Sequence, residues 1–159
     1  MLSAVERKIE QFIVELNDKE VMALYTKIPQ GKRLRAKLIL KIAGSSLPVI
    51  KTAAIVEMIH AASLLHDDVI DDAYTRRAKP SLNALYGNKT AIMLGDILYS
   101  KGFLELNNIS AEVSKIVSAA VVQLSLGELK DVSLSNGFNT NKEIYLEMIY
   151  QKTASLMEA

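Results

Sequence analysis

Residues 47–72 read LPVIKTAAIVEMIHAASLLHDDVIDD, and this stretch decides the fold class. Pro48 suits the first turn of a helix, and no glycine or further proline interrupts the pattern before Asp72. The segment is apolar on most faces until its aspartates, as expected of a central helix that other helices surround. It therefore predicts a long buried helix that ends in an acidic cluster.

Helical periodicity continues on both sides of this segment, and no strand-like alternation of useful length occurs. Ser3 with Glu6, and Thr140 with Glu143, have the spacing of capping boxes, and Ser110 is a further N-cap candidate. Glycine, proline and asparagine clusters interrupt the pattern at residues 29–31, 44–46, 86–88, 107–108 and 135–137, and a polar loop is expected at 73–80. The remaining helices are expected at residues 3–16, 18–28, 33–43, 90–106, 110–134 and 140–159. The sequence predicts an all-α fold in one domain that spans residues 1–159.

Composition excludes several classes of function. The chain is 50% hydrophobic and 23% charged with a net charge of +1, so it lacks the basic field of a nucleic-acid-binding protein. It has no cysteine and two histidines, which excludes disulfides, a thiolate nucleophile and cysteine-built zinc sites and leaves oxygen ligands for a metal. The N-terminus carries charges where a secretory signal would be apolar, and no apolar run suggests a membrane span. We therefore expect a cytoplasmic protein without a transmembrane segment.

The acidic cluster His66-Asp67-Asp68-Val69-Ile70-Asp71-Asp72 is the most informative motif. Asp67 and Asp71 lie one helical turn apart and share a face, where two carboxylates repel each other unless a cation lies between them. Mg²⁺ accepts such hard oxygen ligands together with water and phosphate oxygens. His60 lies two turns earlier, nearly on the same line. A merely solvated cluster is the alternative, but negative charge is unfavourable at a helix C-terminus, which favours a metal site.

Two groups of cations accompany the acidic cluster. Thr75-Arg76-Arg77-Ala78-Lys79 follows it directly, and arginine can bind phosphate through two parallel hydrogen bonds. Gly31-Lys32-Arg33-Leu34-Arg35 opens an earlier helix, where free backbone N–H groups favour anions, although by itself such a group would be read as a solvated helix start. Acidic and basic groups in one site indicate a metal-assisted phosphate ligand.

Together these motifs resemble the trans-isoprenyl (polyprenyl) diphosphate synthase family. LLHDDVIDDAYTRRAKPS is similar to the first aspartate-rich motif and the arginine pair of this family, and QGKRLRAKL is similar to its Gly-Lys-Arg segment. Gly95-Asp96, Gly127-Glu128 and Lys152-Thr153 match further motifs in the family's order. The resemblance implies an antiparallel helical bundle of the isoprenoid synthase type, truncated to about its first half. It also implies a magnesium-dependent homodimer that condenses isopentenyl diphosphate with an allylic diphosphate.

The resemblance also implies roles for single residues. Asp67 and Asp71 would bind Mg²⁺ with support from Asp68, and Arg76 and Lys152 would hold the allylic diphosphate. The isopentenyl diphosphate would be held by Lys32, Arg35, His60 and Arg77, and Thr153 and Glu128 would line the cavity. Three residues depart from the family pattern beside these positions: Gln30 and Ala78 replace the usual glycines, and Ala36 replaces the usual proline.

Product length depends on the residues before the acidic motif. The growing chain is expected to extend from the diphosphate toward the N-terminal end of the same helix, where Ala62 and Ser63 come first. Both are small, whereas aromatic residues in the family stop elongation there, so the chain resembles long-chain members such as octaprenyl diphosphate synthase. Ile59 and Val56 could form a deeper floor. The alternative is that Ala62 and Ser63 are small because a neighbouring helix packs closely.

The family's second aspartate-rich motif does not occur in residues 73–159, where no two aspartates stand together. We therefore expect a truncated chain with little activity of its own and with apolar helix faces that drive self-association. Two other functions stay open. A non-catalytic subunit of a heteromeric prenyl synthase would explain the missing motif, and a helical HD-type phosphohydrolase could use His60 and His66-Asp67 but would need further histidines.

Overall fold

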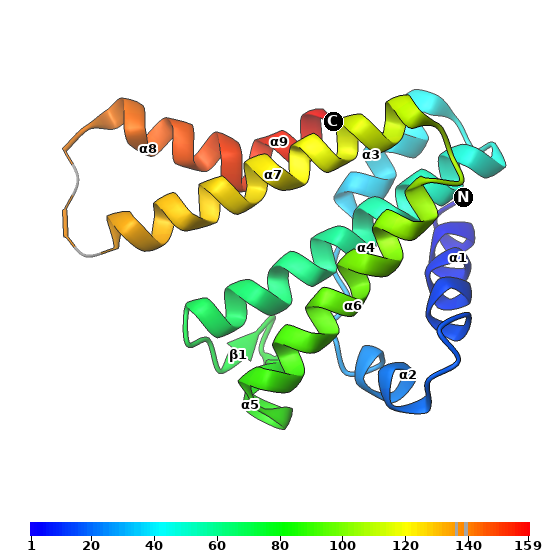
Figure 1. Ribbon diagram of the computed structural model, residues 1–159, viewed down its shortest axis with the longest axis horizontal. Helices are drawn as coiled ribbons and strands as arrows, with labels where there is room; N and C mark the ends of the chain where they lie inside the picture. Colours follow the sequence, from blue (N-terminus) through cyan, green and yellow to red (C-terminus); the bar gives the residue numbers. More distant parts are fainter. Residues whose placement is uncertain (136, 139) are drawn as a thin grey trace. The chain divides into compact units, whose positions relative to one another are not determined.

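The computed structural model describes residues 1–135, 137–138 and 140–159, which form two compact units, Met1–Ile109 and Ser110–Ala159. Most of the described residues are helical, and their strands are two pairs of residues in one hairpin (Figure 1). The predicted all-α class is confirmed.

The first unit contains six helices and the hairpin among its described residues. Their bounds are α1 Leu2–Val14, α2 Lys19–Tyr25, α3 Leu34–Ala43, α4 Leu47–Ile70, β1 Thr75–Arg76, β2 Lys79–Pro80, α5 Leu82–Tyr86 and α6 Asn88–Leu106. The expected long helix at 47–72 is α4, with Pro48 in its first turn. The expected loop at 73–80 contains the hairpin, and α5, which the sequence did not predict, follows it.

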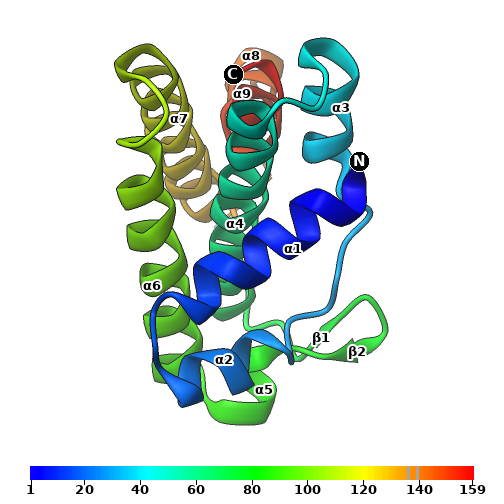
Figure 2. The same cartoon turned by 90° about the vertical axis from the view of Figure 1, so that its right-hand side faces the viewer.

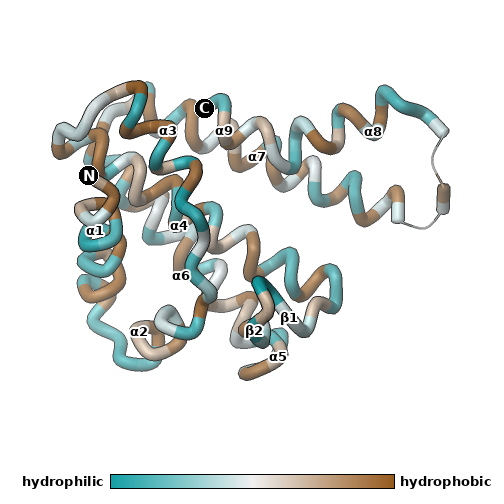
Figure 3. The backbone as a smooth tube through the Cα atoms, turned by 180° about the vertical axis from the view of Figure 1, so that it is seen from behind, coloured by the Kyte–Doolittle hydropathy of each residue, from teal (hydrophilic) through white to brown (hydrophobic). Residues whose placement is uncertain are grey.

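Helices α4 and α6 pack side by side and antiparallel, and they form the centre of the unit (Figures 1 and 3). Close approach depends on glycines of α6. A Cβ at Gly102 would lie 3.2 Å from Cγ1 of Ile59, and a Cβ at Gly95 would lie 2.4 Å from Nε2 of His66. Ile59 is fully buried, so the α4–α6 contact supplies much of the apolar core.

Helix α1 lies across α4 and buries one apolar stripe, Val5, Ile9, Phe12 and Ile13 (Figure 2). The expected Ser3–Glu6 capping box is wrong, because α1 begins at Leu2 and its cap residue, Met1, makes no side-chain hydrogen bond. Glu6 pairs with Arg33 instead. Lys101 of α6 is 7% exposed and bonds Glu15 at 2.8 Å, which links α6 to the residue that ends α1.

The β1–β2 hairpin carries the arginine pair. Its register pairs Thr75 with Pro80 and Arg76 with Lys79, so Arg77 and Ala78 form a two-residue turn. Both turn residues have positive φ, 53° and 60°, as the primed turns of tight hairpins require. Glycine adopts this conformation without strain and alanine does not, which gives a physical reason for the glycine usually found at position 78 in the family.

The second unit is a helical hairpin. It consists of α7 Ala111–Leu134 and an opposing helix in three parts, α8 Lys142–Ile149, the π-helical η1 Tyr150–Ala154 and α9 Ser155–Glu158. Ser110 caps α7 by accepting from the backbone N–H of Val113, as predicted. The expected cap at Thr140 is wrong by one residue, since Asn141 accepts from Glu143 and Ile144. The predicted turn at 135–137 includes Asn136, which lies outside the described residues.

Helix α4 is long and apolar enough to cross a membrane by length and composition. More than half of its most apolar window, 56%, is buried inside the structure, as in the core helix of a bundle. One such helix among the described residues is weak evidence for a span, because core helices of bundles satisfy the same criteria.

Candidate active site

The aspartate-rich motif lies at the C-terminal end of α4. Asp71 is the residue that ends the helix, and its backbone N–H donates to the carbonyl of Asp67 at 2.8 Å. This bond sets the one-turn spacing that the sequence predicted for the two carboxylates. Asp71 is exposed, Asp67 is half-buried and Asp68, on the other side of the helix end, is only 3% exposed.

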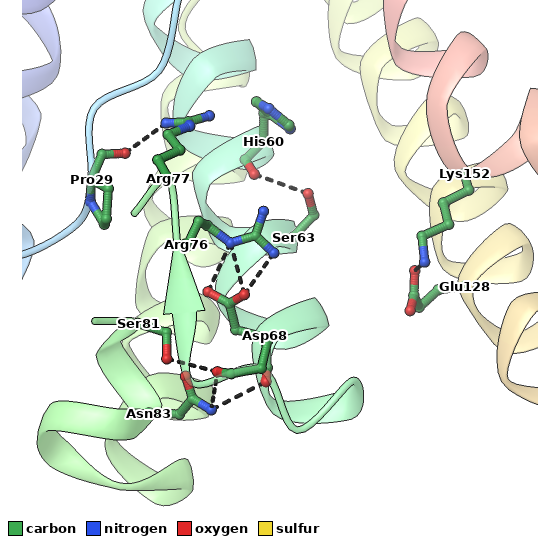
Figure 4. Close-up of polar contacts among 11 residues, drawn as sticks. Pro29, His60, Ser63, Asp68, Arg76, Arg77, Ser81, Asn83, Glu128 and Lys152 are labelled. Atoms are coloured by element: carbon green, nitrogen blue, oxygen red, sulfur yellow. Dashed lines mark hydrogen bonds and ion pairs between the residues drawn. The ribbon is translucent and has the colours of Figure 1, made fainter. Parts of the chain in front are cut away.

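Asp68 holds Arg76 of strand β1 through a two-point ion pair (Figure 4). Nε of Arg76 lies 2.7 and 2.8 Å from the two carboxylate oxygens, and Nη2 lies 2.6 Å from Oδ1. Burial alone would lower the pKa of Arg76, but the hydrogen bonds and charge of Asp68 outweigh burial and raise the pKa above its ordinary value. Asp68 therefore positions a cation instead of offering its carboxylate to a metal.

Residues at the start of α5 fasten the loop between α4 and β1 to the helix end. Nδ2 of Asn83 donates to the carbonyls of Asp68 and Ala73, both at 3.1 Å, and the Ser81 hydroxyl donates to Ala73 at 2.7 Å (Figure 4). Asn83 is 8% exposed and Ser81 is fully buried. These bonds fix the path of the chain from the aspartate-rich motif to Arg76.

A cavity of about 280 Å³ opens beside Asp68 within the first unit. Six cationic or imidazole side chains line it, contributed by the segment before α3, by α3, by α4 and by the hairpin: Lys32, Arg33, Arg35, His60, Arg76 and Arg77. Burial and the positive charges of Arg35 and Arg77 lower the pKa of His60 to about 3, so its imidazole is neutral near pH 7. The predicted diphosphate-binding residues of this unit are thus brought together around one space.

The guanidinium of Arg35 has the features of an anion-binding group. Its Nε is buried and has no hydrogen-bond partner among the described residues, and burial lowers the pKa of its guanidinium. Buried donors of this kind are uncommon in native structures and need an explanation. A phosphate oxygen in the cavity would satisfy it.

Arg77 closes one side of the cavity. Its Nη1 donates to the carbonyl of Pro29 at 2.7 Å, which joins the hairpin to the segment that precedes α3 (Figure 4). A Cβ at Gly31 would lie 2.7 Å from the Arg77 guanidinium, so the absence of a side chain there leaves room for this contact.

Lys152, Glu128 and Asp131 form a second polar group, inside the Ser110–Ala159 unit. Nζ of Lys152 lies 2.9 Å from Glu128 (Figure 4). The same Nζ lies 2.5 Å from Asp131. Burial opposes the charge of Lys152, but Asp131 and Glu128 outweigh it and raise its pKa above the ordinary value. Thr153 is exposed. Lys152 belongs to the π-helical segment, a distortion that often marks functional sites.

The four residues expected to control product length are all buried in the structure: Val56, Ile59, Ala62 and Ser63. None of them is among the residues that line the cavity described above. Ile59 contacts Gly102 of α6, and the Ser63 hydroxyl donates to the carbonyl of His60 at 2.9 Å. Their role in product length stays a prediction.

Asp67 and Asp71 suit a magnesium ion whose remaining coordination positions are filled by a substrate. Mg²⁺ is usually bound through one or two carboxylates together with water and phosphate oxygens. The described part of the chain contains no group of three or more His, Cys, Asp or Glu residues that could enclose a metal by itself. Two carboxylates beside a cationic cavity suit an ion that arrives with a diphosphate.

Sequence reasoning missed several residues that shape the site. Glu57 and Tyr25 line the cavity, Asn83 holds the loop, and Asp131 pairs with Lys152. A lone glutamate inside an apolar helix is a sequence signal for a buried functional carboxylate, so Glu57 could have been found. The others act through contacts distant in sequence, which no local pattern reveals.

Comparison with known proteins accounts for this arrangement. The family model described as polyprenyl synthetase matches residues 18–159. The chain belongs to the polyprenyl synthetase family. This confirms the isoprenoid synthase fold and the resemblance drawn from the acidic and basic motifs.

Members of the polyprenyl synthetase family with different products are similar to the chain. It is 39% identical over 108 residues to octaprenyl diphosphate synthase of Escherichia coli, covering 67% of this chain and 33% of that protein. It is 41% identical over 116 residues to a short chain isoprenyl diphosphate synthase of Methanocaldococcus jannaschii, covering 70% and 35%.

Solved structures of the family superpose on nearly the whole chain. The crystal structure of octaprenyl pyrophosphate synthase from Helicobacter pylori matches with a TM-score of 0.95 and 42% identity, over 99% of this chain and 53% of that one. A polyprenyl synthase from Caulobacter crescentus, complexed with calcium and isoprenyl diphosphate, matches with a TM-score of 0.90 and 31% identity. The chain spans about a third of the curated relatives that it matches and about half of these solved chains.

Proposed function

We propose that this chain contributes the isopentenyl diphosphate pocket and the first metal-binding motif of a magnesium-dependent prenyltransferase. The reaction condenses isopentenyl diphosphate with an allylic diphosphate and releases diphosphate. The cavity lined by Lys32, Arg35, His60, Arg76 and Arg77 is the observation that carries this proposal. A small cavity with so many cations suits a compact, highly charged anion such as a diphosphate.

The residues of the first unit divide the work in this proposal. Arg35, Arg77 and Lys32 hold the diphosphate of isopentenyl diphosphate. Arg76, fixed by Asp68, faces the allylic diphosphate and stabilises negative charge as that group departs. Mg²⁺ held by Asp67 and Asp71 would neutralise the same departing group.

The proposed reaction takes place between the allylic diphosphate and isopentenyl diphosphate. The C1–oxygen bond of the allylic diphosphate breaks, and the homoallylic double bond attacks the resulting allylic cation at C1. A proton is lost from the new chain to the departed diphosphate, so no protein nucleophile is needed. The neutral imidazole of His60 can exchange hydrogen bonds with a bound diphosphate without adding a further charge to the cavity.

A long-chain product is proposed for the whole enzyme. The similarity to octaprenyl synthases of Escherichia coli and Helicobacter pylori supports this, together with the small side chains of Ala62 and Ser63. The chain is also similar to a short chain synthase, so overall identity does not determine product length. The long-chain proposal therefore rests on Ala62 and Ser63.

The alternative functions are not favoured. In an HD-type phosphohydrolase, His66 would bind a metal, but its Nε2 lies 3.1 Å from the carbonyl of Ile92 and 3.3 Å from Asp96 on α6. A non-catalytic subunit would have no need of Asp67, Asp71 and the cationic cavity together.

Binding to the 159-residue chain tests the pocket. Titration calorimetry with isopentenyl diphosphate should show binding that Arg35→Leu weakens about tenfold or more, because a charged hydrogen bond contributes about 1.5–3 kcal/mol. Arg7→Leu is the matched control, since it removes the same charge from an exposed position on α1. Equal affinity in both variants and the wild type would contradict the assignment.

Catalysis is tested in a fusion of residues 1–159 with the part of the Helicobacter pylori synthase that this chain does not cover. The fusion should transfer radiolabelled isopentenyl groups, and Arg76→Leu should lower its turnover by about 10². Residues 1–159 alone should have little or no activity, because one pair of carboxylates holds the diphosphate from one side. Full activity of the isolated chain would refute that division of the site.

A further inference from the structure

Glu57 is a buried charge in the middle of α4. Its side chain is 3% exposed, it lines the cationic cavity, and its neighbours on α4 from Ala53 to Ile59 are buried apolar residues. Burying a carboxylate is costly unless it is paired and hydrogen-bonded. A negative charge beside a cavity for anions also weakens anion binding, so its presence there requires a different benefit.

The contacts of Glu57 lie at the start of α3. Its Oε1 accepts from the backbone N–H of Ala36 at 3.0 Å, and its Oε2 lies 3.6 Å from Nη1 of Arg33. Ala36 is the third residue of α3, so its N–H has no acceptor within the helix. The residue that precedes the helix, Arg33, makes no side-chain capping bond. Glu57 thus caps α3 from a different helix.

Arg33 itself is held in an unfavourable conformation. Its φ is 53°, in the left-handed region that costs L-residues about 1–2 kcal/mol. A two-point ion pair with Glu6, at 2.7 and 3.1 Å, fixes its guanidinium from α1. The backbone at the start of α3 is therefore determined by two carboxylates from two other helices.

Lys32 and Arg35 stand on either side of this fixed point and line the cavity. Their directions follow from the backbone at Arg33 and from the first turn of α3. Arg35 brings a buried Nε without a partner among the described residues, so a small rotation of the first turn would move this donor relative to the cavity. Hydrogen-bond strength falls steeply with such misalignment.

We propose that Glu57 is a positioning residue of the diphosphate pocket: by capping Ala36 it fixes the first turn of α3 and thereby directs Arg35 and Lys32 at the anion. This inference rests on the proposed function of the pocket. In this proposal Glu57 favours anion binding through the geometry of α3, although its negative charge by itself disfavours anion binding. That opposition makes the proposal testable, because geometry and charge predict different results.

The decisive comparison is Glu57→Gln against Glu57→Leu in the 159-residue chain. Glutamine removes the charge but keeps an oxygen that can accept from Ala36, whereas leucine removes both. Calorimetry with isopentenyl diphosphate and, separately, inorganic pyrophosphate in metal-free buffer should give Glu57→Gln an affinity within about threefold of the wild type or tighter. Glu57→Leu should bind at least about tenfold more weakly, although its pocket is more positive.

Amide hydrogen exchange at Ala36 supplies a readout that does not depend on the ligand. Protection should persist in Glu57→Gln and disappear in Glu57→Leu. If the wild type binds neither ligand, the proposed function fails, while exchange at Ala36 still tests the cap. If both variants bind more tightly than the wild type, the carboxylate acts only through its charge and the positioning role is refuted.

A second variant guards against misfolding of Glu57→Leu. Ala36→Pro removes the N–H that Glu57 satisfies, and proline is tolerated in the first turn of a helix. The Ala36→Pro/Glu57→Leu double variant has no N–H at position 36 that lacks an acceptor, so replacing Glu57 by Leu should cost less affinity in the proline background than in the wild type. Equal losses in both backgrounds, or a folded double variant that binds more weakly than Glu57→Leu, would overturn the capping model.

Discussion

Gly127→Ala is expected to destabilise the second unit, contrary to the usual effect of replacing glycine in a helix. Gly127 lies inside α7, where alanine is ordinarily more favourable by about 1 kcal/mol. Here a Cβ would lie 2.4 Å from the backbone N of Lys152 and 2.8 Å from the backbone C of Gln151. Backbone atoms cannot rotate away, so α7 and η1 would have to separate.

The magnitude follows from these two opposing effects. Overpacking costs about 1–3 kcal/mol, and contact with rigid backbone places this site at the upper end, so the net loss is about 2 kcal/mol after the gain in helix propensity. Separation of the helices would also move Lys152 away from Glu128, which now lies 2.9 Å away. The ion pair at the candidate allylic site would weaken as a result.

Urea unfolding followed by circular dichroism, with hydrogen exchange to resolve residues 110–159, measures this loss. Gly102→Ala in helix α6 is the comparison variant, because its Cβ would lie 3.2 Å from the buried side chain of Ile59 and would not meet the backbone of another helix. We expect Gly102→Ala to cost less stability than Gly127→Ala, because the added Cβ meets a side chain and not backbone. A Gly127→Ala protein as stable as the wild type, with unchanged exchange in α7, would refute the close backbone approach.

Four further predictions follow from the structure. Ala78→Gly should stabilise the first unit by about 0.5–1 kcal/mol in urea unfolding, because it relieves a positive φ in the hairpin turn. Because the pKa of His60 is lowered to about 3, the wild type should lose up to about 1.4 kcal/mol of stability per pH unit as pH falls from about 6.5 toward 3, and His60→Gln should lose less. In the active fusion, Ser63→Phe should shift chromatographed products toward fewer isoprene units, whereas Ala62→Phe should mainly destabilise the fold. An unaltered product distribution in Ser63→Phe would remove the basis for the long-chain proposal. Light scattering should show an oligomer of the 159-residue chain, because apolar side chains of α7 such as Leu129 are exposed, and a monomer would contradict this.

Local sequence signals located the helices well but predicted their caps less reliably. Ser110 caps α7 as its position indicated, because its hydroxyl accepts from the backbone N–H of Val113. Ser3 does not cap α1, since the helix begins at Leu2 and Glu6, the other half of the expected box, pairs with Arg33. A tertiary ion pair thus outweighed a local capping pattern, which the sequence alone could not show.

The site was predictable where its chemistry is concentrated in short motifs. The acidic cluster and the arginine pair identified α4 and the hairpin because their charges are adjacent in sequence. Contacts that set the direction of these groups join distant residues: Asn83 reaches the carbonyl of Asp68, and Glu57 reaches Ala36. Helical periodicity carries no information about such pairs, so these hydrogen bonds around the cavity could be identified only from the structure.

Helix α4 shows why its sequence lacks an ordinary polar face. Ile59 and His66, nearly in line after seven residues, contact the glycines of α6, while Asp68 lies about 180° around the helix from Ile59 and lines the cavity. Asp67 and Asp71 occupy a third line, about 80–120° from Ile59. Helix α4 packs against α6 on one side, encloses the cavity on the opposite side and presents carboxylates between these two sides. Such a helix must be apolar nearly all round. Its charged residues are therefore confined to the positions where they act. The lone Glu57 on the cavity side is therefore the residue whose replacement best tests whether the core of this helix also organises its chemistry.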